Sequence, residues 1–158
     1  MTFKVFISSS MKDMRIVNQL KETLKRYEIE PILPSEITGA REGLMEKIRH
    51  QIRTSDCVLV IIGRDLRARS ETVDFEIGMA TGLGKLVIPI VEEGSDIPRT
   101  LANKQYILID QNQPRLSFER AAQYLRRLKI EKERKNAIGG LLLLGLGILL
   151  LGALASED

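Results

Sequence analysis

The sequence predicts an α/β fold, in which helices cover both faces of an open, mainly parallel, five-stranded sheet and one transmembrane helix follows at the C-terminus. Short apolar runs alternate with amphipathic segments over residues 1–135, which is typical of strand–helix repeats. Two of these runs, 57–62 and 86–91, are unbroken, as in central strands that are covered on both faces. We therefore expect a folded domain at 1–130, a basic end of its last helix at 131–136, a membrane helix at 137–155 and an acidic tail at 156–158.

The strands are predicted where short apolar runs are bounded by turn residues. Pro31 interrupts the second strand, and the last strand is the weakest of the set. The expected strands are 4–8, 29–33, 57–62, 86–91 and 106–109.

The helices are predicted from apolar residues at helical spacing. Residues 10–13 have the form of a capping box and open a helix that extends to about Tyr27. Residues 34–43 are expected to form a loop. The remaining helices are expected at 44–53, 70–83 and 118–133.

Composition limits the classes of function. Among the 158 residues, 44% are hydrophobic and 28% are charged, which favours a packed core. The single cysteine, Cys57, excludes an internal disulfide and fits a reducing compartment. The single histidine, His50, provides neither a histidine metal cluster nor a His-based catalytic triad, and no metal is implied. A net charge of +3, scattered along the chain, is too small to indicate a nucleic-acid partner.

The C-terminal segment 137–155 contains 19 consecutive residues without a polar side chain. As an α-helix it would span about 28 Å, close to the thickness of the hydrocarbon core of a bilayer. Six Lys and Arg residues lie within 126–135, so the positive-inside rule places the N-terminal domain in the cytoplasm. Glycines seven residues apart in this segment also allow close contact between copies of the helix. The alternative is a buried or oligomerisation helix.

In a sheet of this type, ligands bind beyond the carboxyl ends of the strands. The first strand ends in three hydroxyl side chains, those of Ser8, Ser9 and Ser10, at the start of a helix. Hydroxyls and free N–H groups at such a position suit a phosphate or another anion, and simple helix capping is the alternative. The chain contains neither a GxGxxG nor a Walker motif, which disfavours a standard dinucleotide or P-loop site.

Glu76 is the main candidate for catalysis. It shares a helical stripe with Val73, Ala80 and Leu83, so it is expected on or beside the face that packs on the sheet. Burial raises the pKa of a carboxyl group unless a cation or hydrogen bonds stabilise its charge. Carboxylates in such settings serve as nucleophile, general base or oxocarbenium stabiliser in glycosidic chemistry. The alternative is a structural role in an ion pair with Arg64, Arg67 or Arg69.

The segments 3–10, 56–62 and 70–80, the last followed by 84–90, together resemble a TIR or TIR-like domain over roughly residues 3–130. This resemblance implies the flavodoxin-like order of strands. In TIR domains that cleave NAD, a serine stands six residues before the catalytic glutamate, and Ser70 and Glu76 match that spacing. The opening segment 6–14 resembles TIR-like domains of prokaryotic defence and signalling proteins. Residues 74–80 also resemble nucleoside deoxyribosyltransferases, whose nucleophile is a glutamate in a similar Glu-x-Gly-x-Ala segment.

The resemblance also has departures. Many TIR enzymes have an aromatic residue and a cysteine between the serine and the glutamate, where this chain has Thr72 and Val73. Phe6 could replace the aromatic residue only if it lay at the end of the sheet. Residues 35–42 correspond to the loop that gates the site in TIR domains, and Gly39 and Arg41 fit that role, with an ordinary connection as the alternative.

The resemblance implies a membrane-anchored NAD glycohydrolase or cyclase in antiviral defence signalling, active as a homo-oligomer. NAD is then the substrate, with no cofactor, and the lipid bilayer is a further partner. Glu76 would stabilise or trap the ribosyl cation, Ser70 would bind ribose or orient Glu76, and Ser8 and Ser9 would line the pocket. Two alternatives remain: a non-catalytic TIR-like adaptor or nucleotide sensor, and an enzyme similar to the nucleoside deoxyribosyltransferases.

Overall fold

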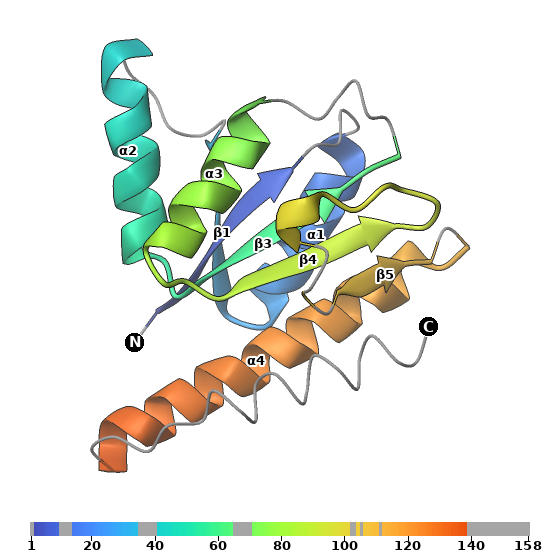
Figure 1. The fold of residues 1–158 in the computed structure, drawn as a ribbon. Coiled ribbons are helices and arrows are strands. Elements are labelled where there is room, and N and C mark those ends of the chain that lie inside the picture. Colours follow the sequence, from blue (N-terminus) through green and yellow to red (C-terminus); the bar gives the residue numbers. More distant parts are fainter. Residues whose placement is uncertain are drawn as a thin grey trace.

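The computed structural model describes residues 2–9, 14–34, 41–64, 71–101, 104, 106–110 and 112–138. They form a sheet of five parallel strands in the order β2-β1-β3-β4-β5, with helices on both of its faces (Figure 1). This confirms the predicted five-stranded α/β fold. The order 2-1-3-4-5 is the flavodoxin-like one, in which the strand order reverses between β1 and β3.

The strands lie close to their predicted positions. The central strand β3 is buried along its whole length, as its unbroken apolar sequence predicts. Pro31 lies in β2, at the edge of the sheet, where a missing N–H group is tolerated. The strands are β1 (Phe3–Ser9), β2 (Ile29–Ile32), β3 (Cys57–Ile62), β4 (Val87–Glu92) and β5 (Ile107–Ile109).

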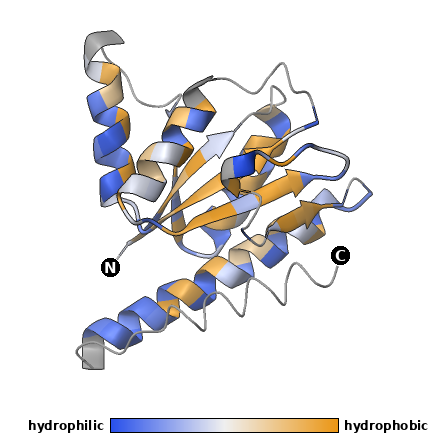
Figure 2. Cartoon of the chain, in the orientation of Figure 1, coloured by the Kyte–Doolittle hydropathy of each residue, from blue (hydrophilic) through white to orange (hydrophobic). Residues whose placement is uncertain are grey.

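In the part of the chain that the structure describes, two helices cover each face of the sheet, and each pair encloses its own hydrophobic cluster. One cluster joins α1 (Met14–Arg26) and α4 (Pro114–Ile138) to the sheet, and the other joins α2 (Arg41–Thr54) and α3 (Glu71–Gly82) to the opposite face. A short 3-10 helix, η3 (Arg99–Leu101), follows β4. In Figure 2 the strands are mostly apolar, while α1, α2 and α4 carry polar residues on their outer sides.

Two helices are longer than predicted. α2 begins at Arg41, so the predicted loop over 34–43 was too long, and Arg41 is a helical residue. α4 begins at Pro114, a residue suited to the first position of a helix, and extends to Ile138. Its distal part is held by Lys132, which contacts Asp56, and by Lys129, which donates to the Glu28 carbonyl. These contacts join residues that are far apart in the sequence, so the helical spacing of apolar residues could not predict them.

The predicted membrane helix at 137–155 lies outside the described residues, apart from Ala137 and Ile138 at the end of α4. Within the part of the chain that the structure describes, none of the helices has the length and apolar character needed to cross a bilayer.

Candidate active site

Strand β1 and helix α3 bring Ser8 and Glu76 together. Side chains alternate along β1, so Ile7 joins the cluster under α1 and α4, while Phe6 joins the cluster under α2 and α3. Ser8 follows this alternation and points to the same side as Phe6. Since Ser8 lies one residue before the end of β1, it is placed at the carboxyl edge of the sheet, where the topology predicts a ligand site.

Helix α3 turns the Glu76 side chain toward the sheet. Val73, Ile77 and Ala80 form its buried face, and Glu76 is 2% exposed on the same side. The predicted stripe is therefore confirmed over these positions. Leu83 departs from it, with 37% exposure, because α3 ends at Gly82 and the chain turns away from the sheet.

Ser8 and Glu76 form a buried polar pair in which two oxygen atoms, Ser8 Oγ and Glu76 Oε2, have no hydrogen-bond partner in the part of the chain that the structure describes. Burial raises the pKa of the Glu76 carboxyl from 4.5 to about 7, and the Ser8 hydroxyl acts in the opposite direction by favouring the charged form. Although the two groups are neighbours, neither Ser8 Oγ nor Glu76 Oε2 makes a hydrogen bond of ordinary geometry within the described structure. Buried polar atoms that lack partners are rare in native proteins, and each has a free-energy cost. A ligand hydroxyl group could satisfy both atoms.

The predicted structural alternative for Glu76 is an ion pair with Arg64, Arg67 or Arg69. Of these, Arg64 binds Glu92, through hydrogen bonds of 3.1 Å from its backbone N to Oε2 and from its Nε to Oε1. Arg67 and Arg69 lie outside the described residues. The Arg64–Glu92 pair joins the ends of β3 and β4 at the same edge of the sheet. No sequence pattern predicted this pair, although Glu92 directly follows the apolar run 86–91, which was a signal that could have indicated it.

The other predicted site residues are placed as follows. Ser9 ends β1 half-buried, and strand alternation directs it toward the face of α1 and α4, away from Ser8. Arg41 is the first residue of α2. Ser10, Gly39 and Ser70 lie outside the described residues. Their roles remain predictions.

Phe6 does not meet the condition set for an aromatic residue in the site. It lies in the middle of β1, paired with Ile32 and Val58, and is completely buried in the core. A side chain in this position packs the interior and cannot stack on a bound base.

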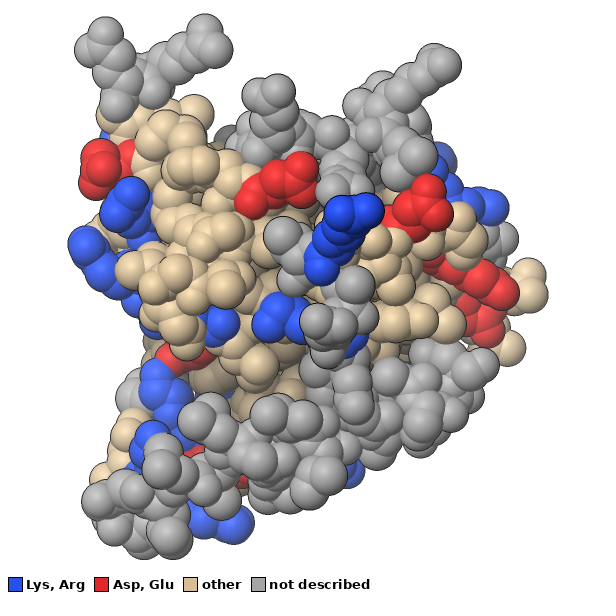
Figure 3. Space-filling model, in the orientation of Figure 1, with Lys and Arg blue, Asp and Glu red and all other residues tan. Residues whose placement is uncertain are grey.

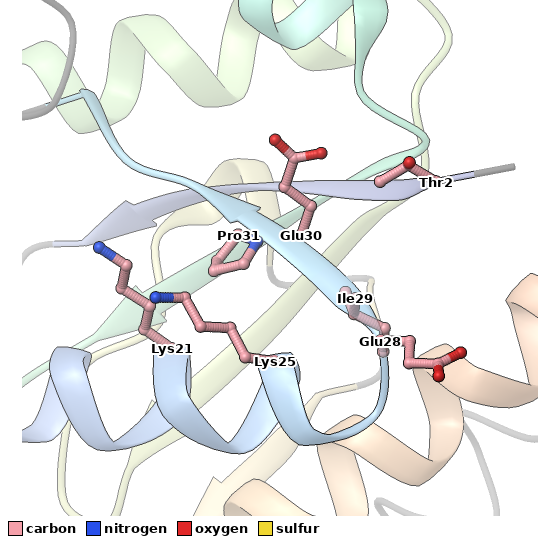
Figure 4. A pocket seen from close by; sticks show the side chains of 7 residues that line it. All are labelled: Thr2, Lys21, Lys25, Glu28, Ile29, Glu30 and Pro31. Atoms are coloured by element: carbon pink, nitrogen blue, oxygen red, sulfur yellow. The ribbon is translucent and has the colours of Figure 1, made fainter.

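A hollow on the surface lies away from the candidate site. It has a volume of about 440 Å³ and lies between α1 and the edge strand β2 (Figure 4). Its lining includes Thr2, Ile29 and Lys25, which lie at the start of β1, the start of β2 and the end of α1. The hollow is therefore at the amino edge of the sheet, away from Ser8 and Glu76.

Within the described ranges, no cluster of His, Cys, Asp and Glu side chains is arranged to bind a metal ion.

Comparisons with known proteins agree with this fold. The family model of the TIR domain matches residues 5–126. No curated protein sequence matches the chain significantly. Among solved structures, the TIR domain of the Toll-related receptor TRR-2 from Hydra magnipapillata is 22% identical, with a TM-score of 0.63 and coverage of 80% of this chain and 99% of that domain.

Two similar structures are enzymes by name. The 2-deoxyribosyltransferase from Bacillus psychrosaccharolyticus is 18% identical, with a TM-score of 0.59 and coverage of 73% of this chain and 90% of that protein. The CMP N-glycosidase BcmB from Clostridium botulinum is also 18% identical, with a TM-score of 0.54 and coverage of 80% and 98%. At these identities the likeness shows a shared fold.

Proposed function

The chain belongs to the TIR domain family, and on this premise we propose that it is an NAD glycohydrolase or cyclase that breaks the bond between nicotinamide and ribose. The observation that carries the proposal is the buried Ser8–Glu76 pair at the carboxyl edge of the sheet, in which Ser8 Oγ and Glu76 Oε2 lack hydrogen-bond partners among the described residues. A carboxylate in a poorly solvated site is suited to stabilise a cation that forms only during the reaction.

In the proposed reaction, the C–N bond to nicotinamide breaks and its electron pair stays on the ring nitrogen, so the pyridinium becomes neutral nicotinamide. The ribose carbon gains oxocarbenium character, which the ionised Glu76 carboxylate stabilises or traps. Water then attacks this carbon and loses a proton, which yields ADP-ribose. Attack by a nitrogen of the same molecule's adenine would yield a cyclic product instead.

Ser8 is proposed to hold a ribose hydroxyl next to Glu76. Its hydroxyl group is buried and has the capacity both to donate and to accept a hydrogen bond. The names of the two similar enzymes indicate chemistry at N-glycosidic bonds, which is the type of bond proposed here. Ser70, Ser10, Gly39 and Arg41 complete the proposed site, and Ser9, which strand alternation directs to the opposite face of the sheet, is left out of it.

The cellular setting is part of the proposal. The apolar sequence at 137–155 would anchor the domain to a membrane, with the site in the cytoplasm. Anchored copies diffuse in two dimensions, so a modest affinity between domains would suffice for assembly. We propose that such assembly activates the enzyme in antiviral defence signalling.

The test is an assay of the full chain, reconstituted in liposomes, with NAD and mass spectrometry of the products. Wild type is compared with Glu76→Gln, which keeps the shape of the side chain but removes its charge. Glu22→Gln, on the exposed side of α1, is the matched control. The proposal expects NAD loss in wild type and in the control, and none in Glu76→Gln.

Unchanged turnover in Glu76→Gln would contradict the proposed role of Glu76. Base exchange on deoxynucleosides, with NAD left intact, would instead identify a deoxyribosyltransferase-like enzyme. Binding of nucleotide without turnover of either substrate would indicate an adaptor or sensor.

A further inference from the structure

Positive charge is concentrated on one of the two helical layers. α1 has four Lys and Arg residues against one Glu, and α4 has eight against three. On the opposite face of the sheet, α2 has four basic residues against two acidic ones, and α3 has three acidic residues and no basic one. α1 and α4 pack side by side, so their outer sides form one surface, which we call the basic surface. The small net charge of +3 for the whole chain therefore conceals a strongly positive side of the domain.

The acidic residues of α1 and α4 offset only part of this charge. Glu22 and Glu119 already form ion pairs with basic residues of α1, at 3.5 Å and 2.6 Å. Glu131 and Glu133 lie near the end of α4, among more numerous Lys and Arg residues. The basic surface thus keeps an excess of positive charge along both helices.

The outer side of α4 combines arginine with apolar side chains. Leu116 and Ile130 are each 44% exposed, and helical spacing places Arg127 and Arg134, which are also exposed, on the same side as Ile130. In Figure 3, Lys and Arg side chains lie at the distal end of α4, where that helix extends past the sheet (Figure 1). Exposed apolar residues among basic ones are typical of helices that lie in the interface of a membrane.

We propose that the basic surface lies flat on a membrane that contains anionic lipids. The inference rests on the proposed anchor at 137–155 and goes beyond it, because an apolar anchor requires no particular lipid charge. Lys and Arg side chains would contact the anionic headgroups, while Leu116 and Ile130 would enter the boundary of the apolar region. Glu76 is buried under the opposite face of the sheet, so the membrane would not cover the candidate active site.

The sequence after α4 is compatible with this orientation. α4 ends at Ile138, and the next two residues are Gly139 and Gly140. Glycine pairs are among the places where helices bend sharply. A bend here would allow α4 to lie along the surface, whereas a straight continuation of the helix would hold the domain away from the membrane.

Nucleic acid is the other polyanion that a positive surface could bind. The aromatic residues of α4, Phe118 and Tyr124, are buried and therefore cannot stack on bases. Leu116 and Ile130 would not be stabilised by phosphate groups, whereas a membrane interface would bury them. The combination of basic and apolar residues therefore favours a membrane.

A label far from the anchor can test this orientation. Leu116 lies about 33 Å from Ile138 along α4, so a label at Leu116→Cys reaches lipid only if the helix lies along the membrane. The native Cys57 is buried and does not compete for the label. Met45→Cys on α2, where Met45 is 42% exposed, is the matched control on the opposite face. The labelled full chain is reconstituted in liposomes with brominated lipids, and quenching of the fluorescent label is measured with and without phosphatidylserine.

We expect quenching at Leu116→Cys to be at least about fivefold stronger with phosphatidylserine than in neutral liposomes, and high salt should remove the difference. Met45→Cys should be quenched weakly in both. Equal quenching at Leu116→Cys in neutral and anionic liposomes would overturn the inference.

Paired charge variants test the basic surface itself. Arg126→Gln with Arg127→Gln, on α4, should remove most of the added quenching at Leu116→Cys. Lys47→Gln with Arg49→Gln removes the same charge from α2 and should leave that quenching unchanged. An equal loss in the two double variants would refute a specific role of the basic surface. Binding of an oligonucleotide by the chain, without added quenching on anionic liposomes, would identify nucleic acid as the partner instead.

The proposed anchor is tested separately by flotation with neutral liposomes in high salt, because salt screens charges but does not release an inserted apolar helix. A chain that failed to float would contradict the anchor. Its binding to anionic but not to neutral liposomes at low salt would still support the basic surface. Neither readout depends on NAD turnover, so the failure of the proposed activity can be told apart from both.

Discussion

The two faces of the sheet treat their polar groups differently. On the face of α1 and α4, Glu119 of α4 accepts hydrogen bonds from Tyr27 at 2.5 Å and from Arg26 at 2.6 Å. On the face of α2 and α3, Ser8 Oγ and Glu76 Oε2 are buried and lack partners within the described structure. Paired groups tie elements together, whereas unpaired ones raise the free energy of the folded state. The face of α1 and α4 therefore stabilises the fold, whereas the face of α2 and α3 is suited to bind a ligand.

The largest expected effect is on activity. Glu76→Gln should lower NAD turnover by at least about 100-fold, because the amide cannot balance a developing positive charge. The variant should fold as well as wild type, since it removes a buried charge that has no ion pair with any of the described residues. Turnover and thermal unfolding, measured on the same preparation, test both parts. If the variant lost turnover only because it unfolded, Glu76 would be a group that supports the fold. The proposed difference between the two faces of the sheet would then not hold.

The second prediction is that stability depends on pH through Glu76. Its pKa is about 7 in the folded protein against 4.5 for an ordinary glutamate, so the folded form binds the proton more tightly. The associated stability is complete below about pH 4.5 and is lost as pH rises through 7, by about 3 kcal/mol in all. Denaturant unfolding at pH 5 and pH 8 should show this loss in wild type and a smaller one in Glu76→Gln. Equal losses in the two proteins would assign the pH dependence to other groups.

A smaller effect is expected for Ser8→Ala. Turnover should fall about tenfold if the hydroxyl holds the substrate, which corresponds to about 1.4 kcal/mol. The free energy of unfolding should stay the same or rise slightly, because the hydroxyl makes no hydrogen bond of ordinary geometry in the described structure. Unfolding curves and NAD assays of this variant distinguish a binding group from a structural one. A clear loss of stability would show that Ser8 supports the fold.

The smallest effect is expected on the opposite face. Tyr27→Phe removes the hydrogen bond to Glu119 and should cost about 1 kcal/mol of stability, with NAD turnover unchanged. Tyr106→Phe is the matched control. It makes the same change on the other face of the sheet, where Tyr106 packs against the hydrophobic cluster under α2 and α3. Chemical denaturation of both variants measures the difference. If Tyr27→Phe also altered turnover, the two faces would not be independent.

Much of the fold could be predicted because buried apolar residues recur along the sequence at the spacing of a strand or a helix. The unbroken run 57–62 indicated a central strand, and β3 occupies those residues. The spacing of Val73, Glu76 and Ala80 indicated a shared buried face of a helix, which α3 confirms. Helix ends were less accurate: α2 begins at Arg41 and α4 extends to Ile138, since long-range contacts contribute to where a helix stops.

The order of residues along the chain was enough to predict that a carboxylate would be buried on a helix of a parallel α/β domain. The groups that surround this carboxylate became known only from the folded arrangement of the elements. The spacing of apolar residues indicates which side of a helix or strand is buried. The residue that packs against that side is set by the order and register of the strands. β1 places Ser8 beside Glu76, β4 gives Arg64 a different partner in Glu92, and the packing of α2 leaves the outer side of α3 open. These contacts join residues far apart in the chain, so no local pattern records them.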